Sequence, residues 1–302
     1  MYDRSDPRSA LADTKAKAVP LPDKFDTAQV ARFYEEAPQE TAPKAKTWYV
    51  RGQNFLVAYT KAEPGAVLTR DAQPDEYGML IHDRATGVVV GTPKETVKVD
   101  GHSVTFVPPG KSSITLPNGG EVVRFFSTRS ADLVAKCSNA KGYAQAHPTV
   151  APLVNWPDPP GGFKVRSYSA DVPAQPGRFG RIFRCTTLMI NYLDPHKGPR
   201  DVTKLSPHHH DDFEQVSLAV EGSFIHHLRW PWTTNMNAWL KDEAIACGAP
   251  SVTVIPPPAI HTSRAMDKVR SQLIDVFSPP RMDFSEKPGW VLNAADYPMP
   301  SK

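Results

Sequence analysis

Three histidines in the second half of the chain are placed to hold a divalent metal ion. His208 and His210 lie in the segment SPHHHDDFEQVSLAVEG, and His261 follows a proline-rich turn. Because alternate residues of a strand face the same side, we expect His208 and His210 to point one way and His209 the other. Imidazole binds several transition metals, and its presence alone does not select among them. The pattern therefore predicts one divalent transition metal per chain, which is Fe, Mn, Ni or Zn.

The spacing of these histidines resembles the two motifs of the cupin family. The first motif corresponds to His208-x-His210, four residues, Gln215, six residues and Gly222. The second corresponds to Pro256-x-Pro258-x-x-His261, with Pro258 where the family usually has glycine. The resemblance covers residues 184–278, and it implies a small β-barrel with the metal inside.

The fourth ligand is one of two neighbours, Glu214 and Gln215. Adjacent residues of a strand face opposite sides, so only one of them can face the metal. Carboxylate chemistry favours Glu214, whereas the six-residue spacing of the cupin motif to Gly222 favours Gln215. We predict Gln215 as the ligand and keep Glu214 as the alternative. Three histidines and a glutamine are neutral and leave the ion its full charge, which makes it a stronger Lewis acid.

Candidate catalytic residues follow the metal motif in the segment SFIHHLRW. His226 and His227 should face opposite sides of a strand, so one of them can enter the barrel and act as an acid or base. Counting alternate residues from Gln215 is not reliable across the glycine turn at Gly222, so both His226 and His227 remain candidates. Arg229 is a candidate for gripping a substrate carboxylate with two hydrogen bonds, and the alternative is a solvated rim residue.

An internal duplication sets the architecture. Four segment pairs occur in the same order in the two halves: 51–59 with 184–192, 104–110 with 252–258, 123–127 with 274–278, and 139–143 with 293–297. One ancestral domain, duplicated and fused, accounts for them. Proline, at 31 of 302 residues, also favours short strands and fixed turns over helices.

The predicted fold is all-β, with two tandem cupin (double-stranded β-helix, or jelly-roll) barrels and few short helices. Short β-branched or aromatic runs predict strands at 55–61, 104–107, 122–127, 188–192, 252–255 and 272–277. One helix is expected at 235–246. The predicted units are an arm (1–45), the first cupin (46–135), a linker (136–165), the second cupin (166–282) and a tail (283–302).

The first copy is predicted to have lost the metal site. Its residues opposite His208, His210 and His261 are Arg70, Ala72 and Ser113, none of which is a good metal ligand. The first barrel should therefore serve as scaffold or interface, and an anion pocket at Arg70 is the alternative.

Composition excludes several classes of function. The net charge is +3 and no run of five or more basic residues occurs, so we expect no nucleic-acid partner. There is no apolar run of about 18 residues and no secretory leader, so we expect no membrane partner. Three scattered cysteines fit free thiols and a cytoplasmic location. The arm, with little core of its own, favours a homodimer.

The predicted function is that of a metal-dependent enzyme acting on a small molecule, an acid. The ion would serve as a Lewis acid on a small hydroxy- or keto-acid or a sugar acid, in an isomerase or lyase reaction. The alternatives are a non-heme iron bicupin dioxygenase and a non-catalytic ligand-binding or regulatory cupin.

Overall fold

The structure is a computed structural model, and it describes residues 24–301. The strands before the midpoint of the chain are β1 (Gln29–Arg32), β2 (Glu40–Ala42), β3 (Ala45–Arg51), β4 (Phe55–Ala62), β5 (Ala66–Gln73), β6 (Tyr77–Ile81), β7 (Val88–Gly91), β8 (Thr96–Val99), β9 (Ser103–Val107), β10 (Gly110–Leu116) and β11 (Gly120–Ser127). The strands after it are β12 (Arg166–Ser169), β13 (Arg181–Arg184), β14 (Met189–Tyr192), β15 (His196–Lys197), β16 (Gln215–Glu221), β17 (Ser223–Arg229), β18 (Glu243–Gly248), β19 (Ser251–Ile255), β20 (Ile260–Ala265) and β21 (Arg270–Phe277). The helices are single turns: α1 (Ala131–Val134), η2 (Ala140–Tyr143), η3 (Met236–Ala238) and α2 (Met282–Ser285).

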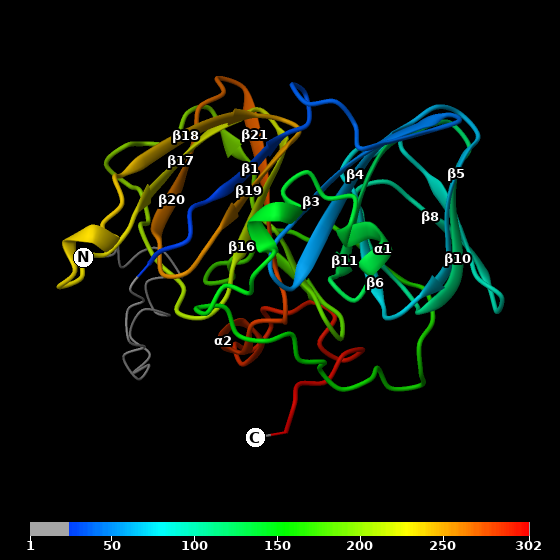
Figure 1. Ribbon diagram of the computed structural model, residues 1–302. Helices are drawn as coiled ribbons and strands as arrows, with labels where there is room; N and C mark the ends of the chain where they lie inside the picture. Colours follow the sequence, from blue (N-terminus) through cyan, green and yellow to red (C-terminus); the bar gives the residue numbers. More distant parts are fainter. Residues whose placement is uncertain (1–23, 302) are drawn as a thin grey trace.

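The strands form two barrels that lie side by side (Figure 1). The first barrel consists of the sheets β12-β9-β6-β11-β4-β3-β2 and β5-β10-β7-β8. The second consists of β1-β19-β16-β21-β14-β13, to which β15 adds, and of β18-β17-β20. The larger sheet of each barrel faces the other barrel, and the smaller sheet lies on the outside (Figure 1). The predicted all-β fold of two tandem barrels is therefore confirmed.

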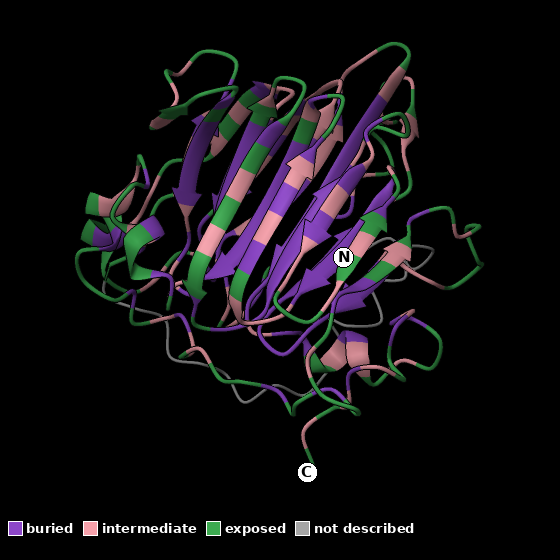
Figure 2. Ribbon diagram, turned by 90° about the vertical axis from the view of Figure 1, so that its right-hand side faces the viewer, coloured by how far each residue is buried: buried purple, intermediate pink, exposed green. Residues whose placement is uncertain are grey.

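The largest apolar cluster of the described residues lies at the seam between the barrels. Leu80, Phe106 and Phe125 of the first barrel pack in it with Leu218 and Val276 of the second. A second cluster fills the interior of the first barrel. The interior of the second barrel has only smaller apolar clusters, because polar side chains occupy part of it. On the outer sheet of the first barrel, buried residues alternate with partly exposed ones along β7 and β10, as expected for a sheet with one face in solvent (Figure 2).

Strand register supports the duplication residue by residue. In the first barrel, Val123 of β11 lies opposite Leu80 of β6 on one side and Tyr59 of β4 on the other. In the second barrel, Ile274 of β21 lies opposite Leu218 of β16 and Tyr192 of β14 in the same way. The alignment drawn from sequence therefore holds across three neighbouring strands in each copy.

The two barrels exchange strands. β1, which precedes the first barrel in the chain, pairs with β19 of the second. β12, which falls inside the predicted second unit (166–282), pairs with β9 of the first. Residues 24–45 of the predicted arm thus contribute β1 and β2 to sheets, and residues 1–23 lie outside the described part of the chain. Each larger sheet is completed by a strand from outside its own barrel's stretch of chain.

The expected helix at 235–246 is wrong. The segment holds the single turn η3 and then the strand β18, which pairs with β17 along its whole length. In β18, Ile245 and Cys247 are more buried than Ala244 and Ala246, so the period is two residues. Sheet pairing overrides the helix preference of this alanine-containing segment. No helix within residues 24–301 is long and apolar enough to span a bilayer.

Candidate metal centre

The three predicted histidines come together at one end of the second barrel. Their nearest ligand nitrogens all lie within 4.8 Å of one another. His208 and His261 are joined by an isolated antiparallel bridge, in which each backbone N–H donates to the carbonyl of the other, at 3.0 and 2.7 Å. His210 and His261 are buried, whereas His209 is exposed and forms an ion pair with Asp211. The segment is not a regular strand, but the side chains alternate as the sequence predicts.

Backbone carbonyls orient two of the imidazoles. Nδ1 of His208 lies 2.9 Å from the carbonyl of Ser206, and Nδ1 of His261 lies 2.9 Å from that of Ala259. A carbonyl can only accept, so Nδ1 carries the proton in both rings, and Nε2 is the nitrogen that offers a lone pair when the ring is neutral. Burial lowers the pKa of His210 well below its usual value, which also keeps that ring neutral. Neutral imidazoles held by an outer hydrogen bond are the form in which histidine binds metals.

Gln215 completes this group. Its Oε1 lies 3.0 Å from Nε2 of His210, and its Nε2 donates to Ser217 Oγ at 2.9 Å and Asp275 Oδ1 at 3.2 Å. Because a carboxylate accepts and cannot donate, Asp275 fixes which side of the amide is nitrogen. The amide oxygen is therefore directed at the three histidines.

These residues fit a divalent metal. Two atoms bound to one ion at right angles, with bonds of about 2.0–2.2 Å, lie about 3 Å apart. The 3.0 Å between His210 Nε2 and Gln215 Oε1 matches that spacing. Three imidazoles and one amide oxygen suit a first-row transition ion and leave positions open for substrate.

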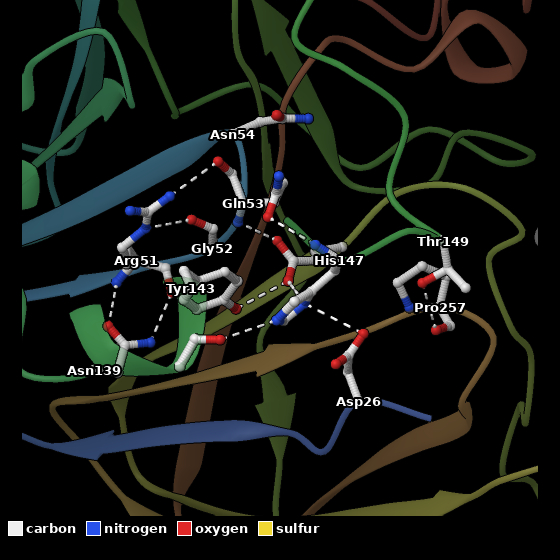
Figure 3. Close-up of polar contacts among 12 residues, drawn as sticks. Asp26, Arg51, Gly52, Gln53, Asn54, Asn139, Tyr143, His147, Thr149 and Pro257 are labelled. Carbon is white, nitrogen blue, oxygen red and sulfur yellow. Dashed lines mark hydrogen bonds and ion pairs between the residues drawn. The ribbon is translucent and has the colours of Figure 1, made fainter. Parts of the chain in front are cut away.

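Glu214 faces the opposite way, into the seam between the barrels. Its carboxylate accepts from the backbone N–H of Gln53 at 2.5 Å and from the hydroxyl of Tyr143 at 2.9 Å. Figure 3 shows these two partners together with His147, whose Nδ1 lies 3.5 Å from both Glu214 and Asp26. The Glu214 carboxylate raises the pKa of His147. Glu214 thus joins three chain segments, and Gln215 lies on the histidine side.

The structure separates the two candidate catalytic histidines. His226 is completely buried inside the barrel, where its Nδ1 lies 2.8 Å from Ser263 Oγ and its Nε2 has no hydrogen-bond partner among the described residues. Burial, with smaller effects of His261 and His227, lowers the pKa of His226 to about 3, so the ring is neutral near pH 7. His227 is half-buried and lines a cleft of about 340 Å³ next to His261.

Arg229 lines the same cleft. Its side chain is 69% exposed, and its guanidinium is engaged in an ion pair with Asp242. A substrate carboxylate would have to displace Asp242 to reach it.

The corresponding residues of the first barrel do not form such a group. Arg70 forms two hydrogen bonds with Asp132, at 2.5 and 3.0 Å, and a third with Gln73. This arrangement uses the guanidinium that an anion pocket would need. Ser113 lies against Gly91, and the three-histidine group is the one cluster of metal-binding side chains found within residues 24–301.

Sequence reasoning missed Asp275 and the aromatic wall of the site. Phe213 stacks on His210 with ring centroids 4.4 Å apart, and the Arg281 guanidinium lies 4.8 Å from the Phe213 ring. Asp275 had a visible signal, because it is the single acid within the apolar run of β21. The sequence contains no comparable signal for Phe213 and Arg281, since their positions beside His210 depend on how distant segments of the chain pack together.

Comparison with known proteins gives similarity in structure and not in sequence. No sequence profile of a known family matches the chain, and no curated protein matches its sequence. The oxalate decarboxylase of Lactobacillus farciminis, solved as a formate complex, superimposes with a TM-score of 0.57 at 13% identity, over 85% of this chain and 88% of that one. A single-residue mutant of Bacillus subtilis oxalate decarboxylase gives 0.55 at 13%, over 88% and 84%. AerE from Microcystis aeruginosa gives 0.50 at 8%, over 79% and 94%.

These superpositions cover both barrels, and at such low sequence identity they support a shared fold and nothing further. The residue pattern, the duplication and the superpositions agree on one architecture. The chain therefore has the bicupin fold, with its three-histidine group in the second cupin.

Proposed function

We propose that this protein is a metal-dependent enzyme of the lyase or isomerase type that acts on a small carboxylic acid. One divalent ion would be held in the second cupin by His208, His210, Gln215 and His261. The observation that carries the proposal is the directed donor set. Three imidazoles converge, and the amide oxygen of Gln215 lies 3.0 Å from one of them.

When bound, the ion would act as a Lewis acid that holds two oxygens of the substrate and polarises one of them. The chain supplies the rest. His226 would contact the substrate from inside the barrel, because its Nε2 is buried without a partner among the described residues. As a neutral ring it can donate a hydrogen bond to the carboxylate of a bound acid or accept one from its hydroxyl. Phe213 and Phe277 flank His210 and keep that side of the site dry.

The substrate class rests on the site and on the structural neighbours together. The oxalate decarboxylase of Lactobacillus farciminis is described as a formate complex, and Mn(II) centres are described in the Bacillus subtilis enzyme. A small acid that chelates the ion through two oxygens suits a neutral ligand set, because the ion keeps its charge for the anion. We propose manganese as the first metal to test and dicarboxylic, hydroxy- and keto-acids as the first substrates.

We also infer a cytoplasmic homodimer. The three cysteines are free and buried, as expected in a reducing compartment. Measuring the mass in solution at micromolar concentration tests the dimer, and a monomer would contradict it.

The test combines metal analysis with a substrate screen. Untagged protein, dialysed against a weak chelator, should retain one metal per chain. His261→Ala should lose it, and His209→Ala, the matched control on the exposed side, should keep it.

The metal-loaded protein is then screened against small acids and sugar acids while oxygen consumption is recorded. Turnover without oxygen uptake supports the proposal, and turnover coupled to oxygen uptake would instead favour the alternative of an oxygen-using enzyme such as a dioxygenase. Metal retained in His261→Ala, or metal bound with no acid turned over, would contradict it.

A further inference from the structure

A second cleft lies at the seam between the barrels, remote from the metal centre. Its volume is about 300 Å³. It is lined by Tyr59, Leu80, His82, Asp83, Thr86, Gly120, Glu121, Val123, Val220 and Pro250. Val220 is five positions along β16 from Gln215, so the cleft is roughly 16 Å from the ligand set at the rise of a strand. It is a separate cavity to which both barrels contribute.

One of the lining residues, Tyr59, carries a buried hydroxyl. Tyr59 is 2% exposed, and its ring stacks on Phe33 with centroids 5.2 Å apart. No described residue meets its Oη in ordinary hydrogen-bond geometry, and after burial, which is the larger cause, the nearby Glu121 carboxylate also raises the pKa of Tyr59. Leaving a buried hydroxyl unsatisfied costs about 1–3 kcal/mol, so such a group in a cavity wall indicates a ligand that supplies the partner.

The duplication shows how this hydroxyl came to be unsatisfied. Tyr192 occupies the equivalent position in the second copy, and its hydroxyl lies 2.6 Å from Nδ1 of His82. The residue equivalent to His82 on the Tyr59 side is Val220, which offers no polar atom. The same replacement of an imidazole by a smaller, apolar side chain both opens the cleft and removes the partner of Tyr59.

The ring of His102 packs edge-on against Tyr192, with centroids 5.1 Å apart. Its equivalent beside Tyr59 is Pro250, which also lines the cleft. Both differences between the copies therefore act in the same direction, toward a cavity on the Tyr59 side and a filled, hydrogen-bonded site on the Tyr192 side.

The lining is apolar in its depth and acidic at its edge. Leu80, Val123 and Val220 form apolar walls, and Asp83 and Glu121 supply carboxylates. Backbone and side-chain hydrogen bonds from Ala85 and Thr86 lower the pKa of Asp83, which keeps it ionised. The lining residues that the structure describes include no lysine or arginine. Lys61 lies nearby, 3.4 Å from Glu121, with both side chains half exposed.

We propose that this cleft binds a small organic cation, a protonated amine on a compact apolar body. The ammonium group donates to Tyr59 Oη and to the Glu121 carboxylate, and the apolar body fills the space that Val220 and Pro250 leave. The Tyr59 hydroxyl thereby gains the partner that His82 provides to Tyr192. The site is independent of the metal chemistry proposed above.

The test is calorimetric titration of the full chain with three probes of similar shape. These are 2-phenylethylamine, the neutral 2-phenylethanol and the anionic 3-phenylpropionate. The amine should bind saturably in the millimolar range or tighter, the alcohol several-fold more weakly, and the acid not at all. Tyr59→Phe, which removes the hydroxyl and keeps the ring, should weaken amine binding roughly tenfold, as the loss of one buried hydrogen bond implies.

Tyr192→Phe is the matched control, because that hydroxyl already has a partner, and its amine affinity should stay within about twofold of wild type. Val220→Phe, which fills the cleft from the other barrel, should abolish amine binding. Circular dichroism melts establish that each variant is folded, and Val220→Leu replaces Val220→Phe if the latter does not fold. No saturable binding of the amine, equal affinity in Tyr59→Phe, or tighter binding of the acid would each overturn the proposal.

Discussion

At the scale of single residues, the candidate metal ligands follow from alternation and from the cupin resemblance. His208, His210 and His261 could be selected from sequence because an alternating histidine pair, followed by a histidine after a proline-rich turn, is typical of a metal site. The fourth ligand could be limited to Glu214 or Gln215 but not assigned from alternation alone. Alternation predicts that the two side chains face opposite sides of the strand, but it does not say which one faces the histidines. Asp275, which orients the amide, lies 60 positions from Gln215 in the chain. Its role depends on which strands pair.

Exchanging the neighbouring acid and amide tests the fourth ligand. Gln215→Glu should keep the metal and lower its Lewis acidity, because the variant adds a negative charge to the site. Glu214→Gln should change metal content little, since the side chain points into the seam toward Tyr143. Metal stoichiometry after dialysis against a weak chelator distinguishes the two. Near-complete loss in Glu214→Gln with full retention in Gln215→Glu would assign the ligand to Glu214.

The two adjacent histidines of β17 offer a second matched pair. His226→Gln should retain the metal and lose most activity, on the order of 100-fold or more, as for the loss of a preorganised hydrogen-bonding group. His227→Gln should remain close to wild type, because that ring lies on the other face of the strand. The measurement is kcat and KM for the best acid from the screen, alongside metal content. Equal loss in both variants would contradict a specific role for His226.

At the scale of elements, strand positions were largely predictable and strand partners were not. All six predicted strands exist, within one or two residues of their expected ends. The helix expected at 235–246 is replaced by β18, since pairing with β17 outweighs local preference. The exchanged strands β1 and β12 carry no periodicity that identifies their partners, and so the sequence could not show that they cross between barrels.

The pairing of β16 with β21 leads to a prediction about the metal site. Asp275→Asn keeps the shape of the side chain. Its amide can donate as well as accept, so it no longer forces Gln215 to turn its nitrogen toward position 275. The Gln215 amide can then rotate and direct its oxygen away from the histidines. We expect metal affinity to fall roughly 10–100-fold, as is usual when a residue that orients a ligand is changed. A competition assay with a fluorescent chelator measures this, with Asp71→Asn, an exposed position on β5 of the first barrel, as the control. Unchanged affinity in Asp275→Asn would show that Asp275 does not orient the ligand.

At the scale of the whole molecule, two glutamates lie at the seam in equivalent positions. Glu214 of the second barrel accepts from Tyr143, and Glu76 of the first accepts from Tyr297 at 2.6 Å. Tyr143 and Tyr297 are themselves partners in the duplication. The seam is thus built twice by the same contact, and only the Glu214 copy has an imidazole, His147, beside the carboxylate among the described residues.

Glu76 makes stability depend on pH. Burial raises its pKa to about 7 from an ordinary 4.5. Between these values the folded chain holds a proton that the unfolded chain has released, so the free energy of unfolding should fall as pH rises from about 4.5 to about 7. In Glu76→Gln the side chain is neutral at every pH. The variant should therefore not show this decrease in the free energy of unfolding, which is on the order of 3 kcal/mol at pH 8. Urea unfolding at pH 5 and pH 8 measures it, with the exposed Glu63→Gln as control. Equal pH dependence in Glu76→Gln and wild type would contradict the assignment.

The strand exchange has a consequence for synthesis on the ribosome. β1 is the first of the described strands to be synthesised, yet its partner β19 begins at Ser251, roughly 220 residues later. At roughly 5–20 residues per second, β1 waits about 10–45 s for that strand. β12 lies past the predicted linker, yet it completes the sheet of the first barrel. A nascent chain released after the first cupin would therefore carry one strand without its partner and a sheet with an open edge. The second cupin must be translated before β1 can join its sheet.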